Sequence, residues 1–325
     1  MFFTKSFAQD TYFQQQVSYA IDVELNPSKQ LLSGKLQLKY THHGSEPISF
    51  IWMHLWPNAY KDNATAYALQ KAKNERDPFL FSKGKYRGWI DSLQFTLKGA
   101  PLKIEAHPGH IDIVKLILPE PLKQGESIEI ETPFRVKIPY ISSRMGYVGS
   151  DYQITQWYPK PAVFDRDGWH PMPYLDLGEF YSEFGDYKVR ITVPDSMQVF
   201  ATGVEDRAMP RAPGKRSYSF SAENVHDFAW FALTKPQFIH DTIRLSNTLS
   251  IPATVAATKN AKVDLEAAMK YTKQTIRYYS DRIGQYQYPQ RSMLWQFKPA
   301  GFQCAGRGRF STFRLGSGSG TLLST

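Results

Sequence analysis

Apolar and polar residues alternate along most of the first 250 residues. The alternation is clear at residues 19–25 and 35–40, and it recurs at 48–55, 111–118, 127–139, 186–194, 217–222 and 228–233. A period of two is typical of strands that bury one face. The turn residues Asn26-Pro27-Ser28 and Ser33-Gly34 separate the first two segments. Since no helical periodicity intervenes, the pattern predicts antiparallel sheets packed face to face. Residues 58–83 are polar and suit either an inserted helix or a long loop.

The pattern changes to a helical period after about residue 255. Apolar positions recur at steps of three and four at Leu265, Met269, Thr272, Ile276, Tyr279 and Ile283. This spacing predicts an amphipathic helix over residues 264–283, of about five turns. Gly284 follows at the position where left-handed geometry often ends a helix. A second domain is therefore expected to begin near this point.

Both ends of the chain differ from the patterned part. Residues 1–17 are predicted to be a tail, in which Ser6-Phe7-Ala8 before Gln9 resembles a small-residue cleavage site. This is either the remnant of a signal peptide, which favours an exported protein, or an ordinary ragged terminus. Residues 291–325 contain six glycines, five basic residues and no acid. They are expected to be a disrupted or disordered tail, the alternative being a basic flexible segment.

Charge and cysteine content exclude several classes of protein. The formal net charge is +9, but the basic residues of 291–325 supply five of these charges. Since no basic helix or RNA-binding motif accompanies the charge, nucleic acid is not an expected partner. Cys304 is the only cysteine, so there is no internal disulfide framework. The sequence contains no apolar run of about 18 residues, so no transmembrane segment is predicted.

Four sequence blocks lie within residues 18–289, and their order and spacing are more specific than any one block alone. The first is the stretch FIWMHLWPNAY at 50–60. The second is ITQWYPKP at 154–161 with DGWHP at 167–171, the third is ENVHDFAW at 223–230, and the fourth is YYSDRIG at 278–284 before Tyr288-Pro289. Together they resemble the N-terminal portion of the gluzincin aminopeptidases, the zinc metallopeptidase family of alanyl aminopeptidase.

The resemblance implies a domain organisation for the whole chain. A mainly β, saddle-like domain of antiparallel sheets is expected over residues 18–250, and the first helical part of a thermolysin-like α/β catalytic domain over 251–290. In this family, elements further along the catalytic domain cover the first helix. The apolar stripe of helix 264–283 is therefore expected to be exposed, with partial disorder or self-association beyond about residue 255.

The resemblance also implies one substrate-binding residue, Gln156. In the family, a glutamine of the β domain contacts the peptide substrate near its free N-terminus, and Gln156 matches that position. A carboxamide offers a donor and an acceptor to a peptide. An acidic residue that binds the substrate amine often stands two positions later, where this chain has Tyr158. The alternative is that Gln156 is a structural residue satisfied by backbone contacts.

Several aromatic residues and histidines of the second and third blocks suit structural roles better than functional ones. Trp157, Tyr158 and Trp169 suit either a subsite wall or, more commonly, a core. His170 suits a structural hydrogen bond better than a metal ligand. His226 and Asp227 have the residue types of an acid–base pair, but adjacent strand residues point to opposite faces.

The sequence lacks the metal-binding motif of the family it resembles. Hydrolysis there uses His-Glu-x-x-His on a helix, with a further glutamate, to hold zinc and activate water. No histidine of this chain is followed by glutamate, and the expected Gly-x-Met-Glu segment after Pro289 is absent. The pairs His107/His110 and His42/His43 lack an evident third ligand. We therefore assign no catalytic or metal-binding residue, and expect zinc only in full-length relatives.

Three functions remain open at this point. The first is a fragment of a zinc metallo-aminopeptidase-like protein that forms one wall of a peptide-binding cleft and is inactive alone. The second is a non-catalytic β-sandwich that binds peptide or carbohydrate, which would require exposure of Trp52, Trp56, Trp157 and Trp169. The third is a protein-interaction module that docks through helix 264–283.

Overall fold

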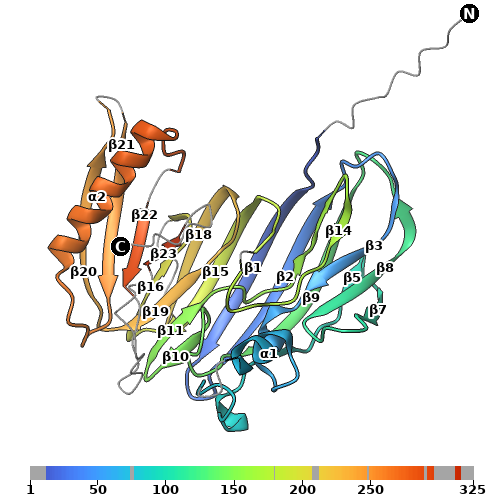
Figure 1. Ribbon diagram of the computed structural model, residues 1–325, viewed down its shortest axis with the longest axis horizontal. Helices are drawn as coiled ribbons and strands as arrows, with labels where there is room; N and C mark the ends of the chain where they lie inside the picture. The colour runs from blue at the N-terminus through green and yellow to red at the C-terminus, as the bar shows by residue number, and fades with distance from the viewer. Residues whose placement is uncertain are drawn as a thin grey trace, which may run out of the picture.

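The computed structural model describes residues 12–73, 77–178, 180–206, 212–246, 249–288, 291–295 and 312–315. Strands dominate this part of the chain, so the mainly β fold class predicted from the sequence is confirmed (Figure 1). No helix of the described residues is long and apolar enough to span a membrane.

The largest sheet has nine strands, and its long central strands lie side by side across the molecule (Figure 1). Their order is β17 (Val204–Glu205), β18 (Lys215–Val225), β15 (Gly185–Pro194), β1 (Gln16–Asn26), β2 (Leu31–Thr41), β9 (Ser127–Lys137), β5 (Thr96–Leu97) and β6 (Ala100–Pro101), with β4 (Trp89–Asp91) also on β9. Neighbours are antiparallel except β1 and β15, which run parallel with Val17 opposite Gly185.

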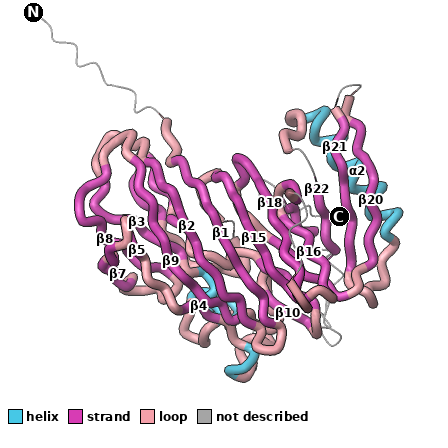
Figure 2. The backbone as a smooth tube through the Cα atoms, turned by 180° about the vertical axis from the view of Figure 1, so that it is seen from behind, coloured by secondary structure: helices cyan, strands magenta, loops and turns pink. Residues whose placement is uncertain are grey.

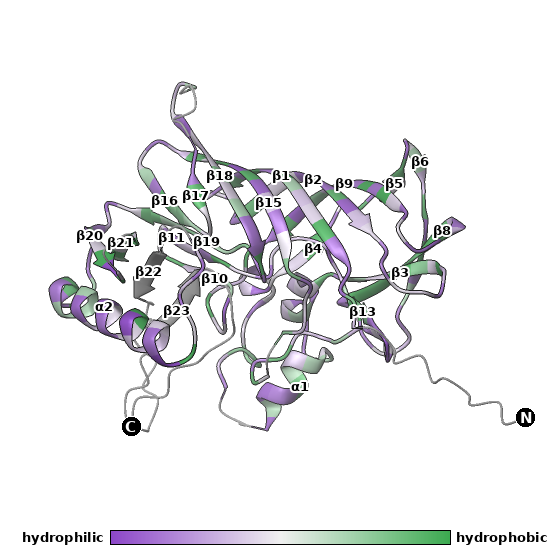
Figure 3. Ribbon diagram, turned by 90° about the horizontal axis from the view of Figure 1, so that it is seen from above, coloured by the Kyte–Doolittle hydropathy of each residue, from purple (hydrophilic) through white to green (hydrophobic). Residues whose placement is uncertain are grey.

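Three smaller sheets complete the β-rich part. One contains β10 (Gly146–Val148), β11 (Asp151–Ile154), β19 (Trp230–Thr234) and β16 (Met197–Ala201). Another contains β12 (Lys160–Pro161), β3 (Ile48–His54), β8 (Ile113–Leu122) and β7 (Lys103–Ala106), and the third is the pair β13 (Val163–Asp165) and β14 (Gly168–His170). The undecided segment 58–83 is mostly loop, with η1 (Trp56–Tyr60) at its start, α1 (Ala66–Ala72) within it and η2 (Gly84–Tyr86) directly after. Figure 3 shows the large sheet along one side of the molecule and α1 on the opposite side.

The two faces of the large sheet differ as a period of two requires. Along β1, the alternate residues from Val17 to Leu25 are buried. Tyr19 of this inner face stacks on Tyr187 of β15, with 4.6 Å between ring centroids. The outer face holds ion pairs such as Lys35–Glu131, whose side chains are about half exposed, so solvent screens their attraction. Burial of the inner face therefore holds the sheet to the rest of the β-rich part.

The last sheet lies at one end of the molecule, opposite β7 and β8 (Figure 2). It contains β20 (Gln237–Arg244), β21 (Ser250–Ala257), β22 (Arg291–Trp295) and β23 (Thr312–Leu315), with β21 and β22 parallel. The helix α2 (Leu265–Arg282) packs against β20 and β21, as Figure 1 also shows. The side chain of Asp264 accepts a hydrogen bond from the backbone N–H of Ala267 at 3.0 Å and so caps the helix.

The expectation that the apolar stripe of this helix is exposed is wrong for its centre, although Ile283 at its C-terminal end is 78% exposed. Met269 and Ile276 are 2% and 3% exposed, and they form a separate core with Ile243, Ile251 and Val255 of β20 and β21. The hairpin β20–β21 was not recognised in the sequence, so its covering role was missed. Self-association through this helix remains a prediction, but the buried stripe cannot mediate it.

The boundaries of the terminal segments also differ from those predicted from the sequence. Strand β1 begins at Gln16, inside the tail predicted over 1–17, and Gln15 is already buried. The cleavage-like residues 6–8 lie outside the described residues. Of the tail 291–325, only strands β22 and β23 are described, so its disruption or disorder stays a prediction. Gly284 lacks the left-handed conformation expected for it, and its N–H donates to the Tyr279 carbonyl at 3.2 Å as the helix ends.

Candidate functional site

Gln156 lies in the loop between β11 and β12 and has an unusual backbone conformation. Its φ is 47°, in the left-handed region that few residues with a side chain adopt. Such a conformation costs of the order of 1–3 kcal/mol and persists only where the surrounding structure enforces it. Residues held in this way cluster at binding and catalytic sites. The same conformation occurs at Gln30, Ser92, Lys98, Asn224 and Lys235, so it points to a site at Gln156 only together with the contacts of that side chain.

The carboxamide of Gln156 is hydrogen-bonded on one side only. Its Nε2 donates to Asp227 Oδ2 at 2.9 Å. Its Oε1 is buried and accepts no hydrogen bond from the described part of the chain. An unpaired buried acceptor costs about 1–3 kcal/mol, and most such groups in folded proteins have a partner. The oxygen is therefore an acceptor that the described residues leave open.

The other carboxylate oxygen of Asp227, Oδ1, accepts two hydrogen bonds. It accepts from the Tyr158 hydroxyl at 2.7 Å and from Lys160 Nζ at 2.8 Å. The Tyr187 hydroxyl lies 2.9 Å from that of Tyr158, whose proton is already directed at Asp227, so Tyr187 donates to Tyr158. The group of Gln156, Tyr158, Lys160, Tyr187 and Asp227 is called the Asp227 cluster below.

The charges of the Asp227 cluster balance. The Lys160 side chain is 3% exposed, and Asp227 supplies its counter-charge. Burial acts to raise the pKa of Asp227, but the Lys160 ammonium and the hydrogen bonds from Lys160 and Tyr158 outweigh it and hold the pKa below its ordinary value. Burial, and then the negative charge of Asp227, raise the pKa of Tyr158 well above its ordinary value. Asp227 is thus an ionised acceptor and Tyr158 a neutral donor.

The sequence-based interpretation placed His226 and Asp227 on a strand, and this is wrong. Strand β18 ends at Val225, so both residues lie in a loop rather than on opposite faces of a strand. Asp227 joins the cluster, whereas the His226 ring lies against Phe184 at 5.6 Å. Burial and the nearby Lys160 lower the pKa of His226. The side chains of the two residues therefore have different partners, and the importance of Asp227 and Lys160 was missed.

The aromatic residues beside Gln156 belong to the core. Trp157 and Tyr158 are 0% and 2% exposed, and Trp157 donates to the Phe228 carbonyl at 3.0 Å. Trp56 is buried as well, while Trp52 and Trp169 are half-buried. The core interpretation of Trp157 and Tyr158 fits these contacts, and no open row of tryptophans lies on the described surface.

The histidines singled out in the sequence make local contacts. His170 Nε2 lies 2.8 Å from Asp165 Oδ1, the structural hydrogen bond expected for it. The rings of His107 and His110 stack at 5.0 Å, and His107 Nδ1 accepts from the backbone of Gly109. Within the described ranges, no three His, Cys, Asp or Glu residues are grouped to hold a metal ion.

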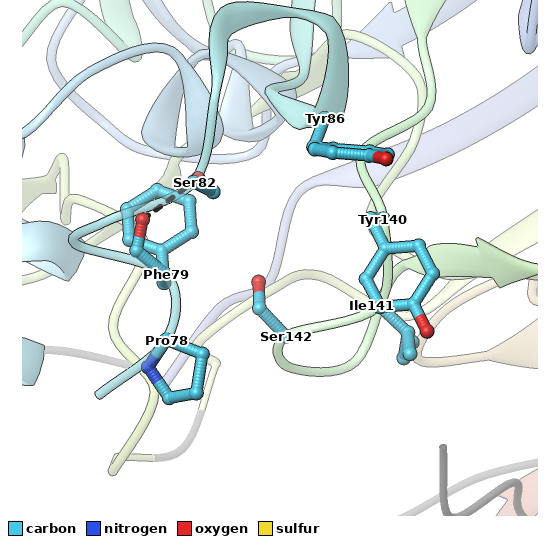
Figure 4. A pocket seen from close by; sticks show the side chains of 7 residues that line it. All are labelled: Pro78, Phe79, Ser82, Tyr86, Tyr140, Ile141 and Ser142. Carbon is cyan, nitrogen blue, oxygen red and sulfur yellow. Dashed lines mark hydrogen bonds between the residues drawn. The ribbon is translucent and has the colours of Figure 1, made fainter. Parts of the chain in front are cut away.

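A pocket of about 380 Å³ opens elsewhere on the β-rich part (Figure 4). It is lined by Pro78, Phe79, Ser82, Tyr86, Tyr140, Ile141 and Ser142. The hydroxyl of Ser82 donates to the Phe79 carbonyl at 2.7 Å, and that of Ser142 accepts from Tyr67 at 3.0 Å. Both serines are thus engaged within the protein, and the pocket shares no residue with the Asp227 cluster.

Comparison with solved structures shows a consistent likeness. A two-domain M1 zinc metallopeptidase bound to L-tryptophan matches with a TM-score of 0.55 at 15% identity, over 86% of this chain and 56% of that one. An M1 zinc metallopeptidase from Deinococcus radiodurans matches with a TM-score of 0.53 at 16% identity, over 87% of this chain and 56% of that one. A structure of the Deinococcus radiodurans enzyme with a Tyr-Ser-Ala substrate matches similarly, with a TM-score of 0.54, 15% identity and the same coverage.

The likeness is one of fold. No family model matches the sequence, and no curated protein matches it significantly. The chain spans 56% of the length of the solved structures it matches. Its β-rich architecture fits the resemblance found in the four sequence blocks and is consistent with an N-terminal portion. The chain therefore has the fold of part of an M1 zinc metallopeptidase.

Proposed function

We propose that this chain forms one wall of the peptide-binding cleft of a zinc-dependent metallo-aminopeptidase-like protein, and that Gln156 contacts the peptide. The observation that carries the proposal is the state of Gln156: a left-handed backbone, one amide edge held by Asp227 and a carbonyl oxygen that accepts from no donor among the described residues. The fold shared with M1 zinc metallopeptidases supports it. So does the peptide present in one of those structures.

The chemistry of this contact follows from the Gln156 oxygen, which has no partner in the part of the chain that the structure describes. A peptide N-terminus offers ammonium hydrogens, and backbone amides offer N–H groups, so Gln156 Oε1 has a partner in either. Because Oε1 is covered in the free chain, binding requires a local movement of the side chains around it. Tyr158 adds no negative charge to attract the amine, since its hydroxyl is neutral and directed at Asp227.

We propose further that the chain alone does not hydrolyse peptides. In M1-type chemistry a zinc ion, held in full-length relatives, lowers the pKa of bound water, and a glutamate takes the proton. This sequence contains no His-Glu-x-x-His motif to provide the two histidines and that glutamate. The residues of this wall would orient a peptide without supplying the nucleophile.

Peptide titration tests the proposal directly. Tyr-Ser-Ala is added to the ¹⁵N-labelled 325-residue chain, and binding is followed by NMR. We expect a dissociation constant in the millimolar range, about −4 kcal/mol, with the largest shifts around Gln156. The variant Gln156→Ala should weaken binding, whereas Gln37→Ala, on the exposed outer face of β2, should not. Equal binding by Gln156→Ala and the unchanged chain would reject the contact.

Hydrolysis is assayed in parallel with an L-amino-acid p-nitroanilide and added zinc. We expect no zinc-dependent release of p-nitroaniline. Release that a chelator abolishes would show a metal centre in this chain and overturn the proposed inactivity.

Two alternative functions require features that the described residues do not have. A carbohydrate-binding sandwich requires exposed tryptophans, but Trp56 and Trp157 are buried and Trp52 and Trp169 are half-buried. An interaction module that docks through α2 requires an open apolar stripe, which β20 and β21 cover. Export and self-association remain proposals to be tested by localisation and by solution mass measurement.

A further inference from the structure

The Asp227 cluster determines how the Gln156 carboxamide is oriented. An ionised carboxylate only accepts hydrogen bonds, so the amide must direct its NH₂ group at Asp227 Oδ2, 2.9 Å away. The carbonyl oxygen is then turned away from Asp227, and no donor of the described ranges pairs with it. The orientation of this side chain thus depends on the charge state of a residue 71 positions later in the chain.

The carboxylate is itself held in place from two other elements. Lys160 Nζ in β12 and the Tyr158 hydroxyl before it both donate to Oδ1, at 2.8 and 2.7 Å. Lys160 Nζ also lies 3.4 Å from the His226 carbonyl and 3.5 Å from Ser182 Oγ. With Oδ1 occupied by these donors, only Oδ2 is directed at Gln156.

We propose that Asp227, anchored by Lys160 and Tyr158, is a positioning residue that fixes Gln156 with its carbonyl oxygen toward the peptide. The inference rests on the proposed function, since it assumes that Gln156 contacts a peptide. It adds that the site presents an acceptor and therefore selects a ligand N–H over a ligand carbonyl at this point.

The variant Asp227→Asn tests the orientation at nearly constant volume. Lys160 and Tyr158 are both donors, so the oxygen of the new amide must take the place of Oδ1. Its NH₂ group then takes the place of Oδ2 and faces the NH₂ of Gln156. Two donors cannot pair, so the Gln156 carboxamide must turn over and present its NH₂ to the ligand. We expect Tyr-Ser-Ala to bind about tenfold more weakly.

A second readout separates positioning from general damage. With ¹⁵N-glutamine labelling, the side-chain NH₂ signal of Gln156 is assigned by its loss in Gln156→Ala. We expect Asp227→Asn to shift this signal and speed its hydrogen exchange, while the other glutamine signals stay in place. Asp165→Asn is the matched control, because Asp165 also accepts from a tyrosine and a basic side chain, Tyr181 and His170. It should change neither the Gln156 signal nor the affinity.

Loss of the negative charge leaves the Lys160 ammonium buried without a counter-charge, which is destabilising. Folding of each variant is therefore checked by circular dichroism. Should Asp227→Asn not fold, the double variant K160Q/D227N removes both charges, and Tyr158 still orients the amide for the same test.

The outcomes are distinct. A shifted Gln156 signal together with weaker peptide binding supports the positioning role. An unchanged Gln156 signal and unchanged affinity in a folded Asp227→Asn overturn it. If Gln156→Ala binds Tyr-Ser-Ala normally, the proposed function fails, while the Gln156 signal in Asp227→Asn still decides whether Asp227 orients that side chain.

Discussion

Stability should fall as the pH rises from about 4.5 to about 7 because of Glu183. This carboxyl lies just before β15 and is 5% exposed. Burial raises its pKa to about 7, against the donation from the backbone N–H of Gln15, and the negative charge of Asp165 adds to the rise. Below about pH 4.5 the folded and unfolded states both hold the proton, so folding incurs no penalty there.

The magnitude follows from the two pKa values. Between about pH 4.5 and 7 the unfolded state releases its proton first, so the folded state loses relative stability as the pH rises. The difference of about 2.5 pKa units, at about 1.4 kcal/mol each, gives a loss of the order of 3 kcal/mol, complete above about pH 8. A loss of this size is a large share of a typical stability of about 5–15 kcal/mol.

The variant Glu183→Gln removes the titration and keeps an oxygen for Gln15. Urea unfolding between pH 4 and 9 should show this variant gaining stability relative to the unchanged chain mainly between about pH 4.5 and 7, by up to about 3 kcal/mol at pH 8. Glu223→Gln, at an exposed position, is the control and should show no such gain. A difference between Glu183→Gln and the unchanged chain that stays constant from pH 5 to pH 8 would refute the reasoning.

Two further substitutions test the packing. Met269→Ala empties a 2% exposed position between α2 and its sheet and should cost about 2–5 kcal/mol in urea unfolding, whereas Tyr271→Ala, at 62% exposure, should change stability by less than about 0.5 kcal/mol. Equal losses of stability in Met269→Ala and Tyr271→Ala would mean that α2 does not pack against β20 and β21. Gly203→Ala places a Cβ 2.3 Å from the Ser221 carbonyl oxygen at a φ of +85°, and Gly99→Ala meets nothing within 4 Å at a φ of +80°. Thermal melting should show a clearly larger loss for Gly203→Ala, since only that site adds a backbone clash to the conformational cost.

Local patterns predicted the local structure well. The alternation at residues 19–25 predicted a strand, and β1 spans it with the expected side chains buried. The three-and-four spacing predicted the helix that became α2. Both signals depend only on neighbouring residues, because a period of two or 3.6 is a property of the element itself.

Features that depend on distant partners were missed. No local signal shows that β15 pairs in parallel with β1, or that β20 and β21 cover the stripe of α2. Asp227 looked like a strand residue beside a histidine, and only the loop after β18 brings it to Gln156. Gln156 itself was found through the family resemblance, since a lone glutamine has no chemical signature in a sequence.

The parallel pairing of β1 with β15 has a consequence for synthesis. The paired residues Val17 and Gly185 are separated by 168 positions, and translation at about 5–20 residues per second needs about 10–30 s to cover them. During this time one edge of β1 has no native partner and can pair with other chains. Closing so long a loop also slows folding relative to local hairpins. Nascent chains ending before residue 185 should therefore depend on chaperones until β15 arrives.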